Sequence, residues 1–251
     1  MRCRQKIRQA ISRMLISLLI QATMPAIVKG QAAQAKAGTL PGISSEWVID
    51  AVLTADGSLL AHVRETAEGL NPEAWRACLA AAQRAETERL IEAFIMRNVS
   101  GARVSAIIPH AENSGRLQLE ARFSVPHYAQ VQAREMVICP TPPGFGEMTS
   151  MIAMASRQQV ITHNRCLTAT AQFRLPSGWS VRKLPETIRF SQPQGSFQAE
   201  FELRDDCLVV RHTLQLNAQT ALATPDAAAR SFTEKIQQAV QTKVAIVRNR
   251  S

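Results

Sequence analysis

The sequence predicts an α+β fold made of two β-rich parts, each with one packed helix. Three observations lead to this prediction. Apolar and polar residues alternate in many short runs, one long stretch in the first half has helical spacing, and a shorter helical stretch lies near the C-terminus. With 251 residues, 46% of them hydrophobic, the chain is long enough for one large domain or two small ones.

The first 45 residues are predicted to precede the fold. A basic segment over residues 1–13 is followed by an apolar stretch from Met14 to Ile20 and by the small-x-small triplet Ala33-Gln34-Ala35. This order is typical of a signal peptide, which we place at residues 1–35, with a linker at 36–45. The remaining chain is then expected to be periplasmic or secreted, with membrane contact only through the N-terminal segment.

The net charge of +9 does not predict a nucleic-acid partner. Six of the cations lie within residues 1–29, so only about +3 remains for the rest of the chain. A nucleic-acid-binding protein usually carries its cations as a patch on a folded face. We therefore expect no nucleic-acid partner.

Residues 46–140 are predicted to form a ββαβββ part. Two alternating runs flank Asp56-Gly57, a pair of residues that favours a hairpin turn. Asn71-Pro72 is a good helix start, and helical spacing then continues to about Arg97. The five strands are expected at 47–54, 59–65, 103–109, 117–125 and 136–139.

A segment with several Pro and Gly residues, 141–160, is predicted to connect this part to a second one at 161–251. The second part is expected to be mainly antiparallel and similar to a β-sandwich. Its strands are predicted at 167–175, 187–191, 197–203, 208–216 and 243–247. A helix beginning near Thr224-Pro225 would place Phe232, Ile236 and Val240 on one face.

No residue pattern in the sequence is typical of a catalytic, metal or cofactor site, and we predict none of the three. The cysteines lack the spacing of metal ligands. Cys166 and Cys207 stand at the starts of two predicted strands of the same part, which leaves a disulfide between them open. The alternative is that most cysteines are buried free thiols that pack as small apolar residues.

One stretch of the second part carries a family resemblance. Leu175-Pro176, Gly178-Trp179, Leu184-Pro185 and Gly195-Ser196-Phe197 follow one another between Phe173 and Leu216. This order resembles the C-terminal β-rich module of bacterial transglutaminase-like proteins of unknown function, and a weaker similarity extends over residues 46–248. The transglutaminase core of those proteins has no counterpart in the sequence, so no catalytic residue is carried over.

The resemblance implies a non-catalytic accessory or protein-interaction module of the cell envelope, whose partner is a transglutaminase-like protein. Candidate contacts with that partner are Met148, Met151, Met154 and Trp179, although Trp179 also fits a purely structural corner. The alternatives are a module that binds a lipid, peptide or glycan, a Cys-dependent enzyme, and a truncated remnant without independent function. A ligand pocket would be lined by Trp75, Leu79 and Phe94, which otherwise belong to an ordinary core.

Overall fold

The computed structural model describes residues 42–68, 88–89, 92–93, 95–96, 99–111, 117–141, 164–217 and 227–249. Most of these residues lie in strands. The elements are β1 (Ile43–Leu53), β2 (Leu59–Glu68), β3 (Arg103–Ala111), β4 (Leu117–Val125), β5 (Gln130–Gln132), β6 (Glu135–Ile138), β7 (Arg165–Arg174), β8 (Trp179–Val181), β9 (Ile188–Gln192), β10 (Gly195–Arg204), β11 (Cys207–Leu216), α5 (Ala227–Val240) and β12 (Val244–Arg248).

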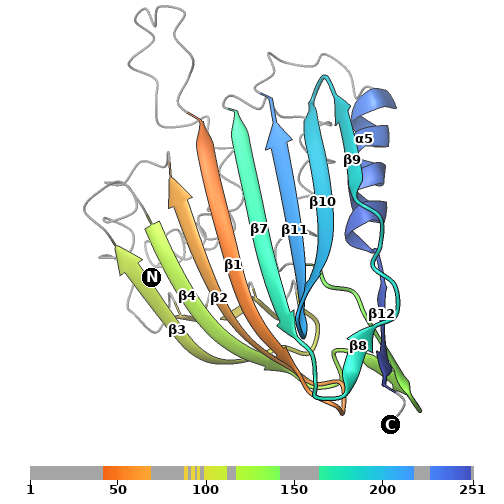
Figure 1. The fold of residues 1–251 in the computed structure, drawn as a ribbon. Helices are drawn as coiled ribbons and strands as arrows, with labels where there is room; N and C mark the ends of the chain where they lie inside the picture. The colour runs from red at the N-terminus through yellow and green to blue at the C-terminus, as the bar shows by residue number, and fades with distance from the viewer. Residues whose placement is uncertain are drawn as a thin grey trace, which may run out of the picture.

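An eight-stranded main sheet runs in the order β3-β4-β2-β1-β7-β11-β10-β9 (Figure 1). Every neighbouring pair is antiparallel except β1 and β7, which run parallel at the centre of the sheet. We call β3-β4-β2-β1 the N-terminal half and β7-β11-β10-β9 the C-terminal half. A smaller second sheet has the order β5-β6-β12-β8.

The predicted α+β fold in two β-rich parts is wrong, because the protein is β-rich and strands from both parts share both sheets. In the main sheet the two parts meet at the β1–β7 pair, and in the second sheet they meet where β6 pairs with β12. The predicted helix over 71–97 lies mostly outside the described residues, and its described residues are helical. Of the connecting segment 141–160, only Thr141 is described.

The strands themselves lie close to their predicted positions. The hairpin at Asp56-Gly57 is confirmed, because β1 pairs with β2 across it and the Gly57 N–H donates to the Thr54 carbonyl at 2.9 Å. The turn also ties the two sheets together, since the Ala129 N–H, just before β5, donates to the Gly57 carbonyl at 2.9 Å. Strands β5 and β8 were not predicted; each is only three residues long.

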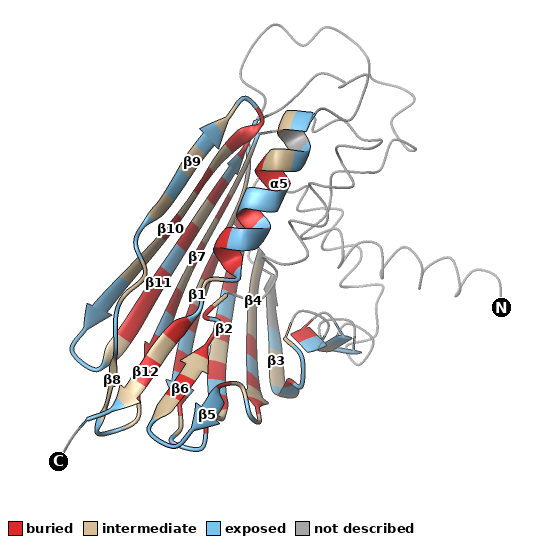
Figure 2. Ribbon diagram, turned by 90° about the vertical axis from the view of Figure 1, so that its right-hand side faces the viewer, coloured by how far each residue is buried: buried red, intermediate tan, exposed pale blue. Residues whose placement is uncertain are grey.

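The core lies on one side of the main sheet, the side that faces α5 and the second sheet (Figure 2). Phe232 and Ile236 of α5 are fully buried and Val240 is nearly so, which confirms the predicted apolar face. The Phe232 ring meets Phe190 of β9 edge-to-face, with centroids 5.7 Å apart. Among the described residues, no helix is long and apolar enough to cross a membrane.

A corner after β7 carries the chain from the main sheet to the second sheet. Pro176 lacks a backbone N–H, and β7 ends two residues before it, as predicted. Gly178 has a φ of 76°, a left-handed conformation that favours glycine. The Trp179 N–H then donates to the Pro176 carbonyl at 3.1 Å, and β8 begins at Trp179 and pairs with β12.

Candidate functional site

Most of the predicted site residues lie outside the described part of the chain. This holds for the candidate contacts Met148, Met151 and Met154, and equally for the candidate pocket residues Trp75, Leu79 and Phe94. Both groups therefore stay predictions. Trp179 is described: it is half-buried in β8, the edge strand of the second sheet, and packs against the core.

The described cysteines are free thiols. Cys166 lies opposite Gln215 and Cys207 opposite Arg174, at opposite ends of the β7–β11 pair, so their sulfurs are too far apart for a disulfide. Neither is fully buried, and Cys139 is exposed, so the prediction of buried thiols is wrong for these three. Within the described ranges, no cluster of His, Cys, Asp and Glu could hold a metal ion.

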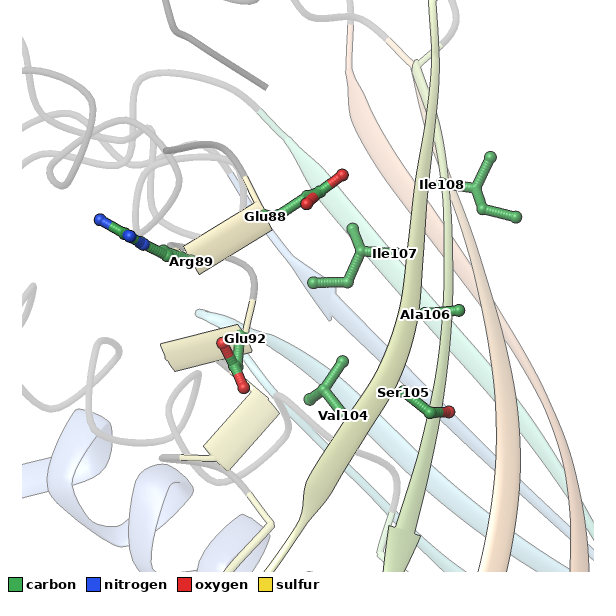
Figure 3. Close-up of a pocket in the computed structure, with 8 residues that line it drawn as sticks. All are labelled: Glu88, Arg89, Glu92, Val104, Ser105, Ala106, Ile107 and Ile108. Atoms are coloured by element: carbon green, nitrogen blue, oxygen red, sulfur yellow. The ribbon is translucent and has the colours of Figure 1, made fainter. Parts of the chain in front are cut away.

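A cavity of about 520 Å³ lies beside β3, an edge strand of the main sheet (Figure 3). One wall belongs to the helical residues 88, 89 and 92, and the other belongs to β3. The lining residues are Glu88, Arg89, Glu92, Val104, Ser105, Ala106, Ile107 and Ile108.

The cavity lies between the helical residues and β3, at one edge of the main sheet. Successive side chains of a strand point to opposite faces, so a pocket over one face is lined by alternate residues. Here five consecutive residues, 104–108, line the cavity. Figure 3 shows Val104 and Ile107 directed toward the helical residues, whereas Ser105, Ala106 and Ile108 point away from them. Val104 and Ile107 also pack against the core, so the helical wall faces the core side of β3.

A β-bulge shapes this edge. The register with β4 shifts between Val104 and Ala106, so that Ser105 has no partner of its own in β4. The Ser105 hydroxyl donates to the Arg122 carbonyl of β4 at 3.1 Å, which holds the bulge in place. Bulges are frequent at sheet edges, where they bend the strand and re-aim its side chains.

The helical wall of the cavity is acidic. Glu88 and Glu92 are four residues apart, one turn along a helix, and so lie on the same helical face. In Figure 3 the side chain of Arg89 extends to the other side, away from β3. The cavity therefore combines two carboxylates, the apolar side chains of Val104 and Ile107, and the main chain of a sheet edge.

Sequence reasoning missed this cavity. One available signal was Pro109 within a predicted strand, because proline is confined to edge strands, strand starts and bulges. The signal identifies an edge, but it does not tell which helix residues face that edge.

A buried carboxylate lies in the N-terminal half. Glu65 of β2 is 4% exposed, and the Ser45 hydroxyl donates to its Oε1 at 2.9 Å. Trp47 Nε1 donates in turn to Ser45 Oγ at 2.9 Å. Burial raises the pKa of Glu65 to about 7, against the opposing effect of the bonds from Ser45 and Trp47.

A buried histidine lies in the C-terminal half, in the same row across the sheet. Glu65 is opposite Trp47, Trp47 is opposite Ala169, and Ala169 is opposite His212. The His212 ring packs between Phe197 and Phe201, with centroids 5.8 and 6.4 Å away, and burial lowers its pKa to about 4. Three strand spacings, roughly 14 Å, separate Glu65 from His212, so they do not form an acid–base pair.

Comparison with solved structures finds the M1 zinc metallopeptidase of Deinococcus radiodurans, at 9% identity and a TM-score of 0.25. A mutant of that enzyme gives 9% identity and a TM-score of 0.26. Each match covers 82% of this chain and 42% of the other chain. Similarity at this level supports no inference about fold or activity. No curated protein matches the sequence.

A family profile matches residues 141–246, which is less than half of the chain. The family is described as a domain of unknown function with solved structure, DUF3858. The match spans β7 to β11, α5 and most of β12, and thus the whole C-terminal half of the main sheet. Two strands of the match have a partner outside it, since β7 pairs with β1 and β12 pairs with β6. The segment that matches the DUF3858 profile thus shares both sheets with strands from the preceding residues.

Proposed function

We propose that this protein is a non-catalytic module of the cell envelope that binds a partner protein through the β3 edge. The observation that carries the proposal is the cavity of about 520 Å³ along five consecutive residues of an edge strand. The unpaired N–H and C=O groups of an edge readily pair with a strand of another chain. Val104 and Ile107 add apolar area beside these groups.

Two sequence features support the envelope location and the kind of partner. Residues 1–35 have the pattern of a signal peptide, which favours a periplasmic or secreted protein. The order of Leu-Pro, Gly-Trp and Gly-Ser-Phe motifs between residues 173 and 216 resembles a module of transglutaminase-like proteins. We therefore propose a transglutaminase-like envelope protein, supplied by another chain, as the partner.

The test is a pull-down from envelope extracts with the tagged chain starting at residue 36, analysed by mass spectrometry. It compares the wild type with Ile107→Asp, which places a third carboxylate beside Glu88 and Glu92, and with Leu60→Asp. Leu60 is 54% exposed and lies in β2, away from the edge, so Leu60→Asp is the matched control.

We expect the wild type and Leu60→Asp to recover a protein with a transglutaminase core, and Ile107→Asp to lose it. Circular dichroism of both variants checks that each is folded. Recovery of no partner, or of the same partner by all three chains, would contradict binding through β3.

A further inference from the structure

We infer that the outward face of the second sheet docks on a membrane surface of anionic phospholipids, through a cluster of unpaired arginines and lysines. The inference rests on the envelope location in the proposed function, but it does not depend on the contact through β3. The sequence predicts membrane contact only through the N-terminal segment, and this face adds a second contact.

The positive charge of the folded chain is concentrated in the second sheet. Seven of the 29 cations and none of the 20 acids lie before residue 42, so residues 42–251 have a net charge of only +2. The segments 130–139, 179–183 and 243–249, which contain the second sheet, hold five cations and one acid, a net charge of +4. The rest of residues 42–251 holds 17 cations and 19 acids, a net charge of −2.

Four of these five cations are unpaired. The single acid, Glu135, forms an ion pair with Arg182, at 2.7 Å between carboxylate oxygen and guanidinium nitrogen. The other four cations are exposed, and none of them forms an ion pair with a residue that the structure describes. They are Arg134, Lys183, Lys243 and Arg248, and we call them the basic cluster.

The second sheet holds the basic cluster within a small area. The Arg248 N–H donates to the Arg134 carbonyl at 2.9 Å, so these two residues are neighbours at one end of the sheet. Lys183 follows Arg182, whose N–H donates to a carbonyl of β12 at 2.9 Å. Lys243 directly precedes β12. Four strands are about 14 Å wide and five strand residues span about 17 Å, so the four cations can meet one surface together.

The outward side chains between the cations are short. The second sheet lies at the lower end of the molecule in Figure 2, and one of its faces is buried, as Met136 and Ile246 show. The alternate residues Val137 and Ala245 are only partly buried. Lys243 is two residues before Ala245 and so belongs to the same outward face. Charged groups on long side chains therefore meet an approaching surface before the backbone of the sheet does.

A bilayer of anionic lipids fits this face better than a protein or a nucleic acid does. Protein interfaces are anchored by large side chains such as Trp, Tyr and Arg in well-packed pockets, and single-stranded nucleic acids stack on aromatic rings. Anionic headgroups instead attract several basic side chains at once without a pocket. The outward residues of the three longer-paired rows include no aromatic ring; they are Glu135, Val137, Ser180, Ala245 and Val247.

The experiment measures co-sedimentation of the chain from residue 36 with vesicles. One set of vesicles is phosphatidylcholine alone, and the other is an equal mixture of phosphatidylcholine and phosphatidylglycerol. The control variant removes three exposed arginines from the face of the main sheet that points away from the second sheet. Circular dichroism checks that both variants are folded. The proteins are the wild type, the cluster variant Arg134→Gln/Lys243→Gln/Arg248→Gln and the control variant Arg122→Gln/Arg174→Gln/Arg211→Gln.

We expect the wild type to bind the vesicles with phosphatidylglycerol and not those of phosphatidylcholine alone, and this binding to weaken at high salt. A cation close to an anionic membrane strengthens binding roughly fivefold, so the cluster variant should bind about 100-fold more weakly. The control variant should lose less than about threefold, because its arginines lie more than a Debye length from the docked face.

The orientation is tested by the reaction of the cysteines with a soluble maleimide, followed by peptide mass spectrometry. Cys139 is exposed and directly follows β6, whereas Cys207 is the first residue of β11 in the main sheet. Vesicles with phosphatidylglycerol should slow the labelling of Cys139 and leave that of Cys207 unchanged. Protection of Cys207 alone would show that another face docks and would overturn the inference.

The remaining outcomes separate this inference from the proposed function. Equal vesicle binding by the cluster and control variants would overturn the inference. Poly-glutamate or single-stranded RNA that bound as tightly as the vesicles would also overturn it, because the partner would then be an acidic protein or a nucleic acid. Ile107→Asp should keep vesicle binding. If it does so while the pull-down recovers no partner, the contact through β3 fails and this inference stands.

Discussion

The two halves of the main sheet have the same number of strands but end differently. In the C-terminal half, the edge strand β9 has five residues, lies between Pro185 and Pro193, and is backed by α5, whose Phe232 contacts Phe190. In the N-terminal half, the edge strand β3 has nine residues and borders a cavity of about 520 Å³. Among the described residues, one half thus ends in a short strand packed under a helix, whereas the other ends in a long strand that borders a cavity.

The halves also differ in the ionisable group that each one buries. Glu65 and His212 occupy the same row of the sheet, one in each half. Burial disfavours the charged form of both, so it raises the pKa of the acid and lowers the pKa of the base. The two halves are therefore expected to respond to pH in opposite directions.

The largest expected effect is Gly195→Ala, at the start of β10 in the C-terminal half. An added Cβ would lie 2.0 Å from the Gln215 carbonyl oxygen of β11, and the φ of 157° is unfavourable for alanine. Since the obstacle is backbone, we expect a loss of about 4 kcal/mol in the free energy of unfolding. Urea denaturation measures it. The control is Ser196→Ala, at the next residue of β10. If Gly195→Ala lost no more free energy of unfolding than this control, β10 and β11 would be able to move apart easily at this point.

Removing the aromatic contact of the C-terminal half comes next. Phe232→Ala deletes a fully buried ring, and we expect a loss of about 3–4 kcal/mol. The exposed neighbour on the same helix, Gln237→Ala, is the control and should change stability by less than about 0.5 kcal/mol. The counterpart in the N-terminal half, Ile107→Ala, should cost clearly less than Phe232→Ala because it borders open space. Equal losses would mean that both edges are packed alike.

The third prediction concerns pH. Between pH 4.5 and 7 the Glu65 carboxyl is protonated in the folded state and ionised in the unfolded state. Its contribution to the free energy of unfolding therefore falls as pH rises through this range. Between pH 4 and 6.5 His212 is protonated in the unfolded state and neutral in the folded state. Its contribution to the free energy of unfolding therefore falls as pH decreases through this range. Each contribution reaches up to about 3 kcal/mol, and the two oppose each other between pH 4.5 and 6.5.

Single variants separate these two contributions. Relative to the wild type, Glu65→Gln should gain stability as pH rises from 4.5 to 7. The wild type loses stability over this range because Glu65 ionises only when unfolded, and glutamine does not ionise. His212→Leu should instead lose stability relative to the wild type as pH rises from 4 to 6.5. Urea denaturation at pH 4.5, 5.5, 6.5 and 7.5 measures both. If both variants follow the pH profile of the wild type, neither group titrates as its burial implies.

The smallest effect is expected at the corner that joins the C-terminal half to the second sheet. A Cβ added at Gly178 would have no neighbouring atom within 4 Å. The loss of stability in Gly178→Ala therefore comes only from the φ of 76°. We expect a loss of about 1 kcal/mol, measured by thermal unfolding against the exposed control Ser177→Ala. A loss as large as that of Gly195→Ala would mean that the corner is held by more than its backbone conformation.

Local sequence patterns predicted most of the elements. Alternation placed β4 at 117–125 and the neighbouring strands within a few residues of their bounds, because a half-buried strand needs apolar residues at every second position. The hairpin at Asp56-Gly57, the apolar face of α5 and the end of β7 before Pro176 followed from equally local rules. Strands β5 and β8 escaped because three residues are too few to show a period.

The sequence by itself thus determined which of the longer segments are strands and which of their faces are buried. Only the tertiary structure decided that β1 lies parallel to β7, because alternation fixes the face of a strand and not its neighbour. That single pairing joined strands of the two predicted parts into one eight-stranded sheet. The tertiary structure also decided which helical residues face β3 across the cavity, because no local pattern connects residues 88–92 with residues 104–108.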